Sequence, residues 1–321
     1  MPNHQVVALA GGVGGAKLAL GLAGVLPAAA LTVVVNTADD FEHLGLHISP
    51  DLDTVMYTLA GLANPETGWG RRNETWTVLD ALAELGSETW FRLGDKDLAT
   101  HIERTRRLRA GHTLGAITRD LAQRLGVAPT LVPMSDDPVR TVVTTDRGDL
   151  AFQDWFVRLR CEPAVRSVRF AGVDTAKPHP VLCDLDAAGS RGVVVCPSNP
   201  FVSVAPILAV PGVRQAIARA KMPKVAVTPI VGGRAIKGPA AKMLAELGHE
   251  VSSLGVARFY KGLIDGFVLD AEDAGLAPAI EALGMRVCVT DTMMRNDADK
   301  RRLAATALEF MDELAVSRRH S

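Results

Sequence analysis

Four aspartates follow the second strand that the sequence predicts, and they are the residues best suited to chemistry. They are Asp39, Asp40, Asp51 and Asp53. Any one of them could simply cap a helix or stabilise a turn. Four carboxylates around one strand exit would repel one another unless a cation or hydrogen-bond donors compensate, and Mg²⁺ prefers such oxygen ligands. The cluster therefore favours a Mg²⁺ site. Two histidines lie among the aspartates, but no third nitrogen or sulfur ligand is evident, so zinc is disfavoured.

A glycine-rich segment, residues 11–17 (GGVGGAK), lies between an apolar run and a stretch with helical spacing. Glycines let backbone N–H groups approach phosphate oxygens at a helix N-terminus, although a merely tight turn is the alternative. The segment lacks both the Gly-Lys-Ser/Thr ending of a Walker A loop and the complete G-x-G-x-x-G spacing of a dinucleotide site. We predict contact with a nucleotide phosphate through the glycines and the lysine, although the lysine could instead be a solvated residue of the first helical turn. These are Gly11, Gly12, Gly14, Gly15 and Lys17.

Three other segments carry polar groups that could bind a ligand. Residues 196–200 (CPSNP) follow a predicted strand and include Ser198 and Asn199, although a structural proline turn is nearly as plausible. Arg92 lies just before residues 93–97 (LGDKD), which could be an acidic helix cap or could lie near an anionic substrate. Residues 69–76 combine tryptophans with arginines, which could stack on a planar ring or form an ordinary surface loop.

The composition excludes several classes of protein. The chain has 321 residues, 48% of them hydrophobic, and a formal net charge of −1. It can therefore bury a large core, and it has no global positive field to attract nucleic acid. The apolar stretches are interrupted before the roughly 20 residues that a membrane-spanning helix needs. Four dispersed cysteines without metal-ligand spacing, and no secretion signal, lead us to expect a cytoplasmic protein.

The order of apolar runs predicts the fold. Non-alternating runs such as Val33-Val34-Val35 are typical of parallel strands covered on both faces, and they alternate with helical stretches. We expect an α/β fold with a doubly wound, mainly parallel Rossmann-like sheet and a small β-rich insertion. The predicted divisions are residues 1–128 for the first part of the core with a helical segment, 129–178 for the insertion, and 179–321 for the second part.

The ordered set of motifs resembles one family, the 2-phospho-L-lactate transferases of coenzyme F-420 biosynthesis, which include phosphoenolpyruvyl and 3-phosphoglyceryl variants. The resemblance spans nearly the whole chain. It rests on the glycine loop, the two aspartate segments, and four further motifs, namely LGDKD at 93–97, PMSDDP at 133–138, PSNP at 197–200 and SSLGV at 252–256.

The resemblance implies transfer of a phosphorylated three-carbon acid, which is 2-phospholactate, phosphoenolpyruvate or 3-phosphoglycerate. The donor would be linked to guanosine diphosphate, the acceptor would be the ribityl hydroxyl of the deazariboflavin Fo, and GMP would be released. Mg²⁺ would be the cofactor, and the enzyme would be a homodimer.

The resemblance also assigns roles to individual residues. Asp39 and Asp51 match the family's metal ligands, and with Asp53 they form the predicted catalytic set. The positions that match the Fo site are Asp53, Arg92 and Asp95. The glycine loop would face the guanine nucleotide together with Ser198, Asn199 and Pro200.

Two other functions fit parts of the sequence. The first is a non-catalytic regulator that binds a nucleotide sugar. Proteins of the gluconeogenesis-factor type are similar to this chain in the glycine loop and the Asp39-Asp40 segment. The motifs at 50–54 and 93–95 favour the transferases instead. A nicotinamide-dependent oxidoreductase is disfavoured by the incomplete dinucleotide motif.

Overall fold

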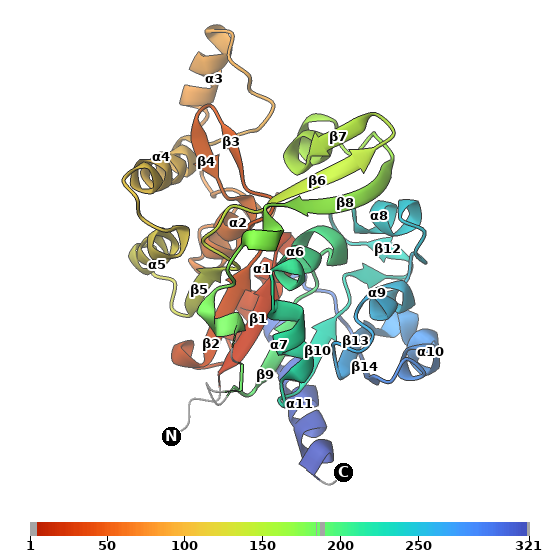
Figure 1. Ribbon diagram of the computed structural model, residues 1–321. Helices are drawn as coiled ribbons and strands as arrows, with labels where there is room; N and C mark the ends of the chain where they lie inside the picture. The colour runs from red at the N-terminus through yellow and green to blue at the C-terminus, as the bar shows by residue number, and fades with distance from the viewer. Residues whose placement is uncertain (1–4, 184, 187–189, 320–321) are drawn as a thin grey trace.

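The core of the molecule is a seven-stranded parallel sheet (Figure 1). The computed structural model describes residues 5–183, 185–186 and 190–319. The strand order is β14-β13-β10-β9-β1-β2-β5, and all six neighbouring pairs are parallel. The predicted doubly wound α/β fold is confirmed. The strands are β1 (Val6–Ala10), β2 (Leu31–Val35), β5 (Thr130–Pro133), β9 (Gly192–Val195), β10 (Lys224–Val227), β13 (Gly266–Asp270) and β14 (Arg286–Thr290).

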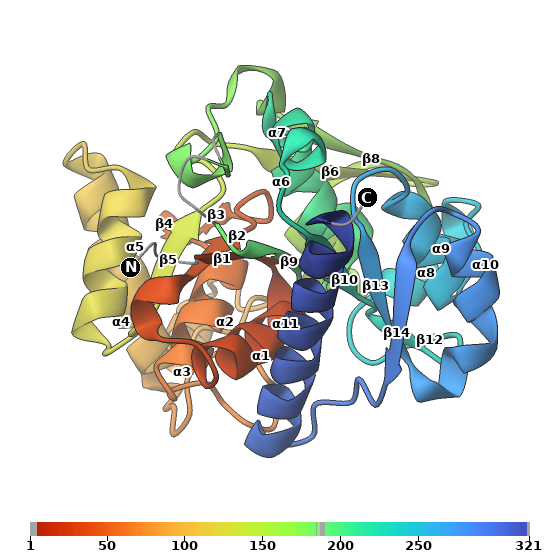
Figure 2. The same ribbon diagram turned by 90° about the horizontal axis from the view of Figure 1, so that it is seen from below.

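Helices cover both faces of this sheet, as Figures 1 and 2 show from two directions. The strands are buried on both sides, so alternate residues of β1 enter different cores: Val7 and Leu9 pack on one face, Val6 and Ala8 on the other. The helices are α1 (Gly12–Ala23), α2 (Pro50–Leu59), α3 (Thr77–Glu84), α4 (Asp95–Arg109), α5 (Leu114–Arg124), α6 (Ala205–Ala209), α7 (Val213–Arg219), α8 (Ala240–Glu246), α9 (Ser253–Phe259), α10 (Ala277–Glu281) and α11 (Asp297–Arg319).

The sheet has a topological switch point beside β1. The chain passes from β1 to β2 on one side, whereas β9 pairs with the other side of β1. In such a sheet the connections leave on opposite faces at this point, and a crevice opens at the carboxyl ends of the strands. The glycine loop follows β1, and Pro197 to Pro200 follow β9. The topology therefore brings two predicted ligand-binding segments together.

A three-stranded antiparallel sheet forms the predicted β-rich insertion. Its order is β7-β6-β8, with β6 (Arg140–Thr145), β7 (Gly148–Ala151) and β8 (Val165–Ala171). Thr145 pairs with Gly148, so the hairpin turns through Asp146 and Arg147. β5 belongs to the seven-stranded sheet although it lies within the range assigned to the insertion. The domain boundaries themselves stay a prediction.

The small elements were not predicted. A hairpin of β3 (Phe41–His43) and β4 (Leu46–Ile48) separates the two pairs of aspartates. A second short hairpin joins β11 (Ile230–Val231) and β12 (Arg234–Ala235). These strands have two or three residues, too few to produce a recognisable alternation.

No single helix among the described residues is long and apolar enough to cross a membrane. The segments 200–209 and 213–219 pass such a test only when joined, and they meet at a bend of 89°.

Helix α1 packs closely against α11, and a glycine permits this contact. A Cβ atom on Gly21 would lie 2.1 Å from the carbonyl oxygen of Lys300. We therefore expect Gly21→Ala to lower the free energy of unfolding by about 1–3 kcal/mol, because the two helix backbones must separate. Urea unfolding would measure the change.

Gly24→Ala, at the end of the same helix, is the control. Its Cβ would lie 3.0 and 3.1 Å from side-chain atoms of Arg301 and at an ordinary 3.4 Å from the carbonyl oxygen of Gly21, and its φ of −82° suits alanine. Equal losses in the two variants would contradict the close-contact argument.

Candidate active site

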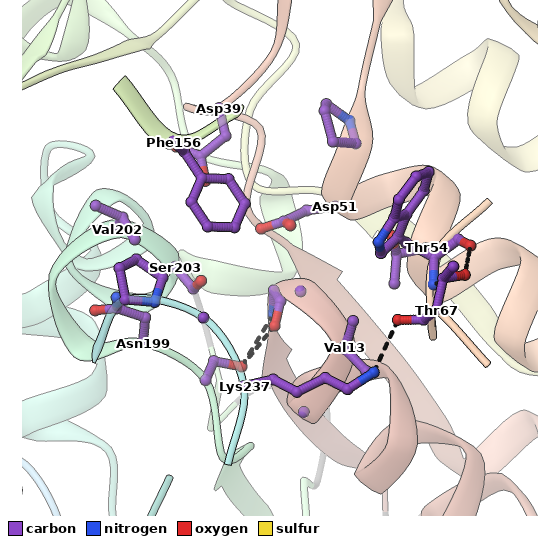
Figure 3. Close-up of a pocket in the computed structure, with 18 of the residues that line it drawn as sticks. Val13, Asp39, Asp51, Thr54, Thr67, Phe156, Asn199, Val202, Ser203 and Lys237 are labelled. Carbon is purple, nitrogen blue, oxygen red and sulfur yellow. Dashed lines mark hydrogen bonds between the residues drawn. The ribbon is translucent and has the colours of Figure 1, made fainter. Parts of the chain in front are cut away.

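A cavity of about 860 Å³ lies at the carboxyl ends of the central strands. Segments that follow β1, β2 and β9 line it, together with part of the antiparallel insertion and the 232–239 loop. Figure 3 shows side chains from these segments around the space. The topological switch point therefore coincides with a pocket in the size range of small-molecule binding sites.

Asp39 and Asp51 lie together in this cavity and share one hydrogen-bond donor. The side-chain nitrogen of Asn36 is 3.1 Å from Asp39 Oδ2 and 3.0 Å from Asp51 Oδ2. The same nitrogen also lies 3.1 Å from the carbonyl oxygen of Val202. Figure 3 shows both aspartates near Phe156. One neutral amide therefore bridges the two carboxylates, and neither forms an ion pair with a cationic side chain among the described residues.

Burial and mutual repulsion disfavour the ionised forms of this pair. Burial, and then the neighbouring Asp51 charge, raise the pKa of Asp39 well above its usual range, although Asn36 opposes the shift. Burial also raises the pKa of Asp51 to about 6 against hydrogen bonds from Asn36 and the Gly12 backbone. Asp39 Oδ1 is buried and lacks a hydrogen-bond partner of acceptable geometry among the described residues. A hard cation would satisfy both the orphaned oxygen and the excess negative charge.

Asp40 has structural contacts instead. Its Oδ2 accepts a hydrogen bond from the hydroxyl of Ser49 at 2.8 Å and lies 3.1 Å from His47 Nε2. Its side chain is buried, and it does not line the cavity. Asp40 therefore holds the β3–β4 hairpin against the start of α2.

Asp53 belongs to a second buried network, which was not predicted. Arg104 from α4 binds both carboxylate oxygens, with Nη1 at 2.9 Å from Oδ2. His101 lies between Asp53 and Asp97, with Nδ1 at 3.7 Å from Asp53 and Nε2 at 3.3 Å from Asp97. The hydroxyl of Tyr57 is 2.7 Å from Asp97 Oδ1. Asp53 thus reaches the cavity already paired with a guanidinium group.

This network contains a second possible metal site. Ligand atoms of Asp53, Asp97 and His101 lie within 4.8 Å of one another. A cation there would compete with Arg104, which already neutralises Asp53. The Asp39–Asp51 pair has no such cation, so it is the better site for Mg²⁺.

The glycine loop brings its backbone close to the carboxylates and to the β9 segment. A Cβ on Gly11 would lie 2.6 Å from Asp51 Oδ2, and one on Gly14 would lie 2.2 Å from the carbonyl oxygen of Pro197. Gly12 has a positive φ of 60° and begins α1. These three glycines line the cavity, whereas Gly15 is buried behind them against Ser198.

Of the three residues predicted to bind the nucleotide after β9, two line the cavity and one does not. Ser198 donates a hydrogen bond to the carbonyl oxygen of Gly11 at 2.9 Å, and its side chain ties the two loops together. Ser198 and Asn199 line the cavity, and Asn199 also accepts a hydrogen bond from the Phe201 backbone at 3.0 Å. Pro200 is buried at the start of a short helical turn and does not line the cavity.

Comparison with known proteins identifies the family. A model described as 2-phospho-L-lactate transferase CofD matches residues 6–307. The chain belongs to the CofD family. It is therefore a transferase of the kind that acts in coenzyme F-420 biosynthesis. The resemblance seen in the sequence is confirmed.

Relatives with two different names match almost the whole chain. The phosphoenolpyruvate transferase of Streptomyces griseus is 45% identical over 317 residues, which cover 97% of this chain and 99% of the relative. The 2-phospho-L-lactate transferase of Methanosarcina mazei is 39% identical over 304 residues, with coverage of 95% and 99%. A crystal structure of a UPF0052-family protein from Bacillus halodurans has a TM-score of 0.61 at 16% identity, covering 96% of this chain and 99% of that protein, which shows a shared fold alone.

Two residues that matched the Fo site of the CofD family lie in different places. Arg92 lines the cavity, where its guanidinium carbon lies 4.2 Å above the ring of Trp76. Asp95 does not line it. Its carboxylate accepts hydrogen bonds from Thr75 and from the Thr77 and Val78 backbone at the start of α3. A role for Asp95 in this CofD-family chain would therefore act through the position of α3.

Several cavity residues escaped the sequence analysis. Phe152 and Phe156 stack with ring centres 5.3 Å apart, and Gln153 between them bonds the Asp39 carbonyl oxygen at 3.2 Å. Arg160 also lines the cavity, with an unusual positive φ of 50°. All four lie at or after the end of β7, where the sequence suggested only a hairpin and no ligand. The aromatic and cationic residues that follow β7 could have indicated a ligand-binding segment.

The raised pKa of Asp51 predicts a pH-dependent cost of folding. The carboxyl titrates near 3.8 when exposed and near 6 in the folded protein, so the folded state keeps its proton to higher pH. Stability should therefore fall as pH rises from about 4 to about 6. Asp51→Asn should make this fall smaller, leaving the part that comes from the burial of Asp39, and should be more stable than the wild type at pH 7.5 by roughly 1–3 kcal/mol without divalent cations.

Urea unfolding of the metal-free protein between pH 4.5 and 7.5 would measure how the free energy of unfolding changes with pH. Asp174→Asn, at an exposed site away from the cavity, is the control and should follow the wild type. Parallel pH curves for wild type and Asp51→Asn would show that burial does not penalise this carboxylate.

Proposed function

We propose that this CofD-family transferase moves a phosphorylated three-carbon acid from a guanosine diphosphate-linked donor to the ribityl hydroxyl of Fo, with Mg²⁺ as cofactor and GMP as product. The observation that carries the proposal is the Asp39–Asp51 pair, in which a buried and a half-buried carboxylate meet in a cavity beside a glycine loop. A reaction between a diphosphate and an alcohol needs charge neutralisation and positioning more than covalent catalysis.

Asp39 and Asp51 would hold the cation. They supply carboxylate oxygens, one of which lacks a partner, and burial makes their unpaired charge costly. When bound, Mg²⁺ would neutralise the diphosphate and the charge that develops on the departing phosphate. Asn36 orients both carboxylates through its single amide.

The donor nucleotide would lie along the glycine loop. Gly11, Gly12 and Gly14 give it access to the backbone at the start of α1, where the helix dipole favours an anion. Gly11, the N-cap residue, has no side chain to cap this helix terminus, and of the first N–H groups the one of Gly12 already bonds Asp51. Ser198 keeps the loop in place, and Asn199 adds a polar group at the edge.

The acceptor would lie toward Asp53 and the aromatic side of the cavity. Trp90, Phe91 and Phe156 line that side and could contact the deazaflavin ring. Both oxygens of Asp53 contact Arg104, so Asp53 is suited to orienting the ribityl hydroxyl. Arg104 would act as a positioning residue that fixes Asp53.

The reaction itself is a substitution at phosphorus. The hydroxyl oxygen forms a bond to the phosphorus that carries the three-carbon acid, and the bond from this phosphorus to the bridging oxygen breaks. GMP leaves with that electron pair, and the hydroxyl proton passes to a base. The transferred acid would be 2-phospholactate, phosphoenolpyruvate or 3-phosphoglycerate. We further propose that the enzyme is a homodimer and acts in the cytoplasm.

A direct test would offer the purified protein Fo, Mg²⁺ and each guanylylated donor in turn. Mass spectrometry should find one Fo adduct and GMP in equal amounts. Asp39→Asn should lower turnover by at least about 100-fold, since it removes a proposed metal ligand while keeping the side-chain shape.

Asp174→Asn is the matched control and should keep wild-type turnover. Near-normal turnover by a folded Asp39→Asn protein would contradict the metal assignment. Absence of an Fo adduct with all three donors would contradict the proposed reaction.

A further inference from the structure

Lys237 reaches across the cavity from the loop between β12 and α8. Its ammonium nitrogen donates a hydrogen bond to the backbone carbonyl oxygen of Thr67 at 2.8 Å, as Figure 3 shows. The side chain is exposed and lines the cavity. Within the described parts of the chain, Lys237 has no carboxylate within ion-pair distance.

A second ammonium group lies nearby. Lys17, on α1, donates to the carbonyl oxygen of Met294 at 3.1 Å and likewise has no ion pair among the described residues. Burial, and then the charges of Lys237 and Lys300, lower the pKa of Lys17. Lys300 itself is neutralised by Asp297 at 2.8 Å. The ammonium groups of Lys17 and Lys237 therefore line one wall of the cavity, and each bonds only a neutral carbonyl oxygen.

This wall adjoins the glycine loop. A Cβ on Gly68 would lie 2.7 Å from Val13 Cγ1 and 3.3 Å from Lys237 Nζ, so Lys237 sits against the first turn of α1. Val13 and Lys17 are four residues apart and share one face of that helix. The two ammonium groups thus flank the end of the helix that attracts anions.

We propose that Lys237, together with Lys17, binds the diphosphate of the guanine-nucleotide donor. The inference rests on the proposed function and adds a binding residue to it. A diphosphate carries two or more negative charges, which the two positive charges of the ammonium groups would neutralise. The flexible stem of Lys237 lets its nitrogen exchange the carbonyl oxygen of Thr67 for a phosphate oxygen.

Calorimetric titration with GDP and with guanosine, at one fixed salt concentration, tests this role. Lys237→Met should weaken GDP binding about tenfold, the value of one charge-assisted contact of about 1.4 kcal/mol, and guanosine binding by less than about twofold. Lys237→Arg keeps the charge and should recover most of the GDP affinity. Lys242→Met is the control, because Lys242 pairs with Glu246 and does not line the cavity.

Three results would overturn the inference, and they can be told apart. Unchanged GDP affinity in a folded Lys237→Met protein would show that the ammonium does not contact the phosphates. Equal losses for GDP and guanosine would show that Lys237 supports the loop or the base. A wild-type protein that binds neither guanine ligand would contradict the proposed function as well.

Discussion

The shared amide of Asn36 is the interaction on which the rest of the site depends. It is the hydrogen bond that joins Asp39, after β2, to Asp51, at the start of α2. Two neighbouring carboxylates, Asp39 buried and Asp51 half-buried, are costly as ions when only neutral groups bond them, and their raised pKa values express this cost. The fold tolerates the cost because the strands beneath are buried on both faces and hold the two segments rigidly.

The glycine loop is built around the same constraint. Gly11 must lack a side chain because Asp51 and Ser203 occupy that space, and Gly14 must lack one because of the Pro197 carbonyl. The loop can therefore pass between the carboxylates and the β9 segment, which opens the start of α1 to the cavity. The metal-binding and nucleotide-binding functions that we propose thus share one tightly packed backbone.

The sequence predicted what depends on local pattern. The parallel strands and the longer helices follow from apolar runs and helical spacing, and the position of Asp39 follows from the end of β2. The Asp53–Arg104 pair could not be predicted, because its partners are 51 residues apart and neither segment indicates the other. Asp95 shows that a recognisable motif does not fix the position of a side chain. Its carboxylate accepts hydrogen bonds from the start of α3 and does not line the cavity.

The most direct test of the central claim is the position of a bound divalent cation. Crystals soaked with Mn²⁺, which also takes oxygen ligands, would locate it by anomalous scattering. The account predicts one site bound by the carboxylates of Asp39 and Asp51. Occupancy at the cluster of Asp53, Asp97 and His101 instead, with the Asp39–Asp51 pair empty, would contradict it.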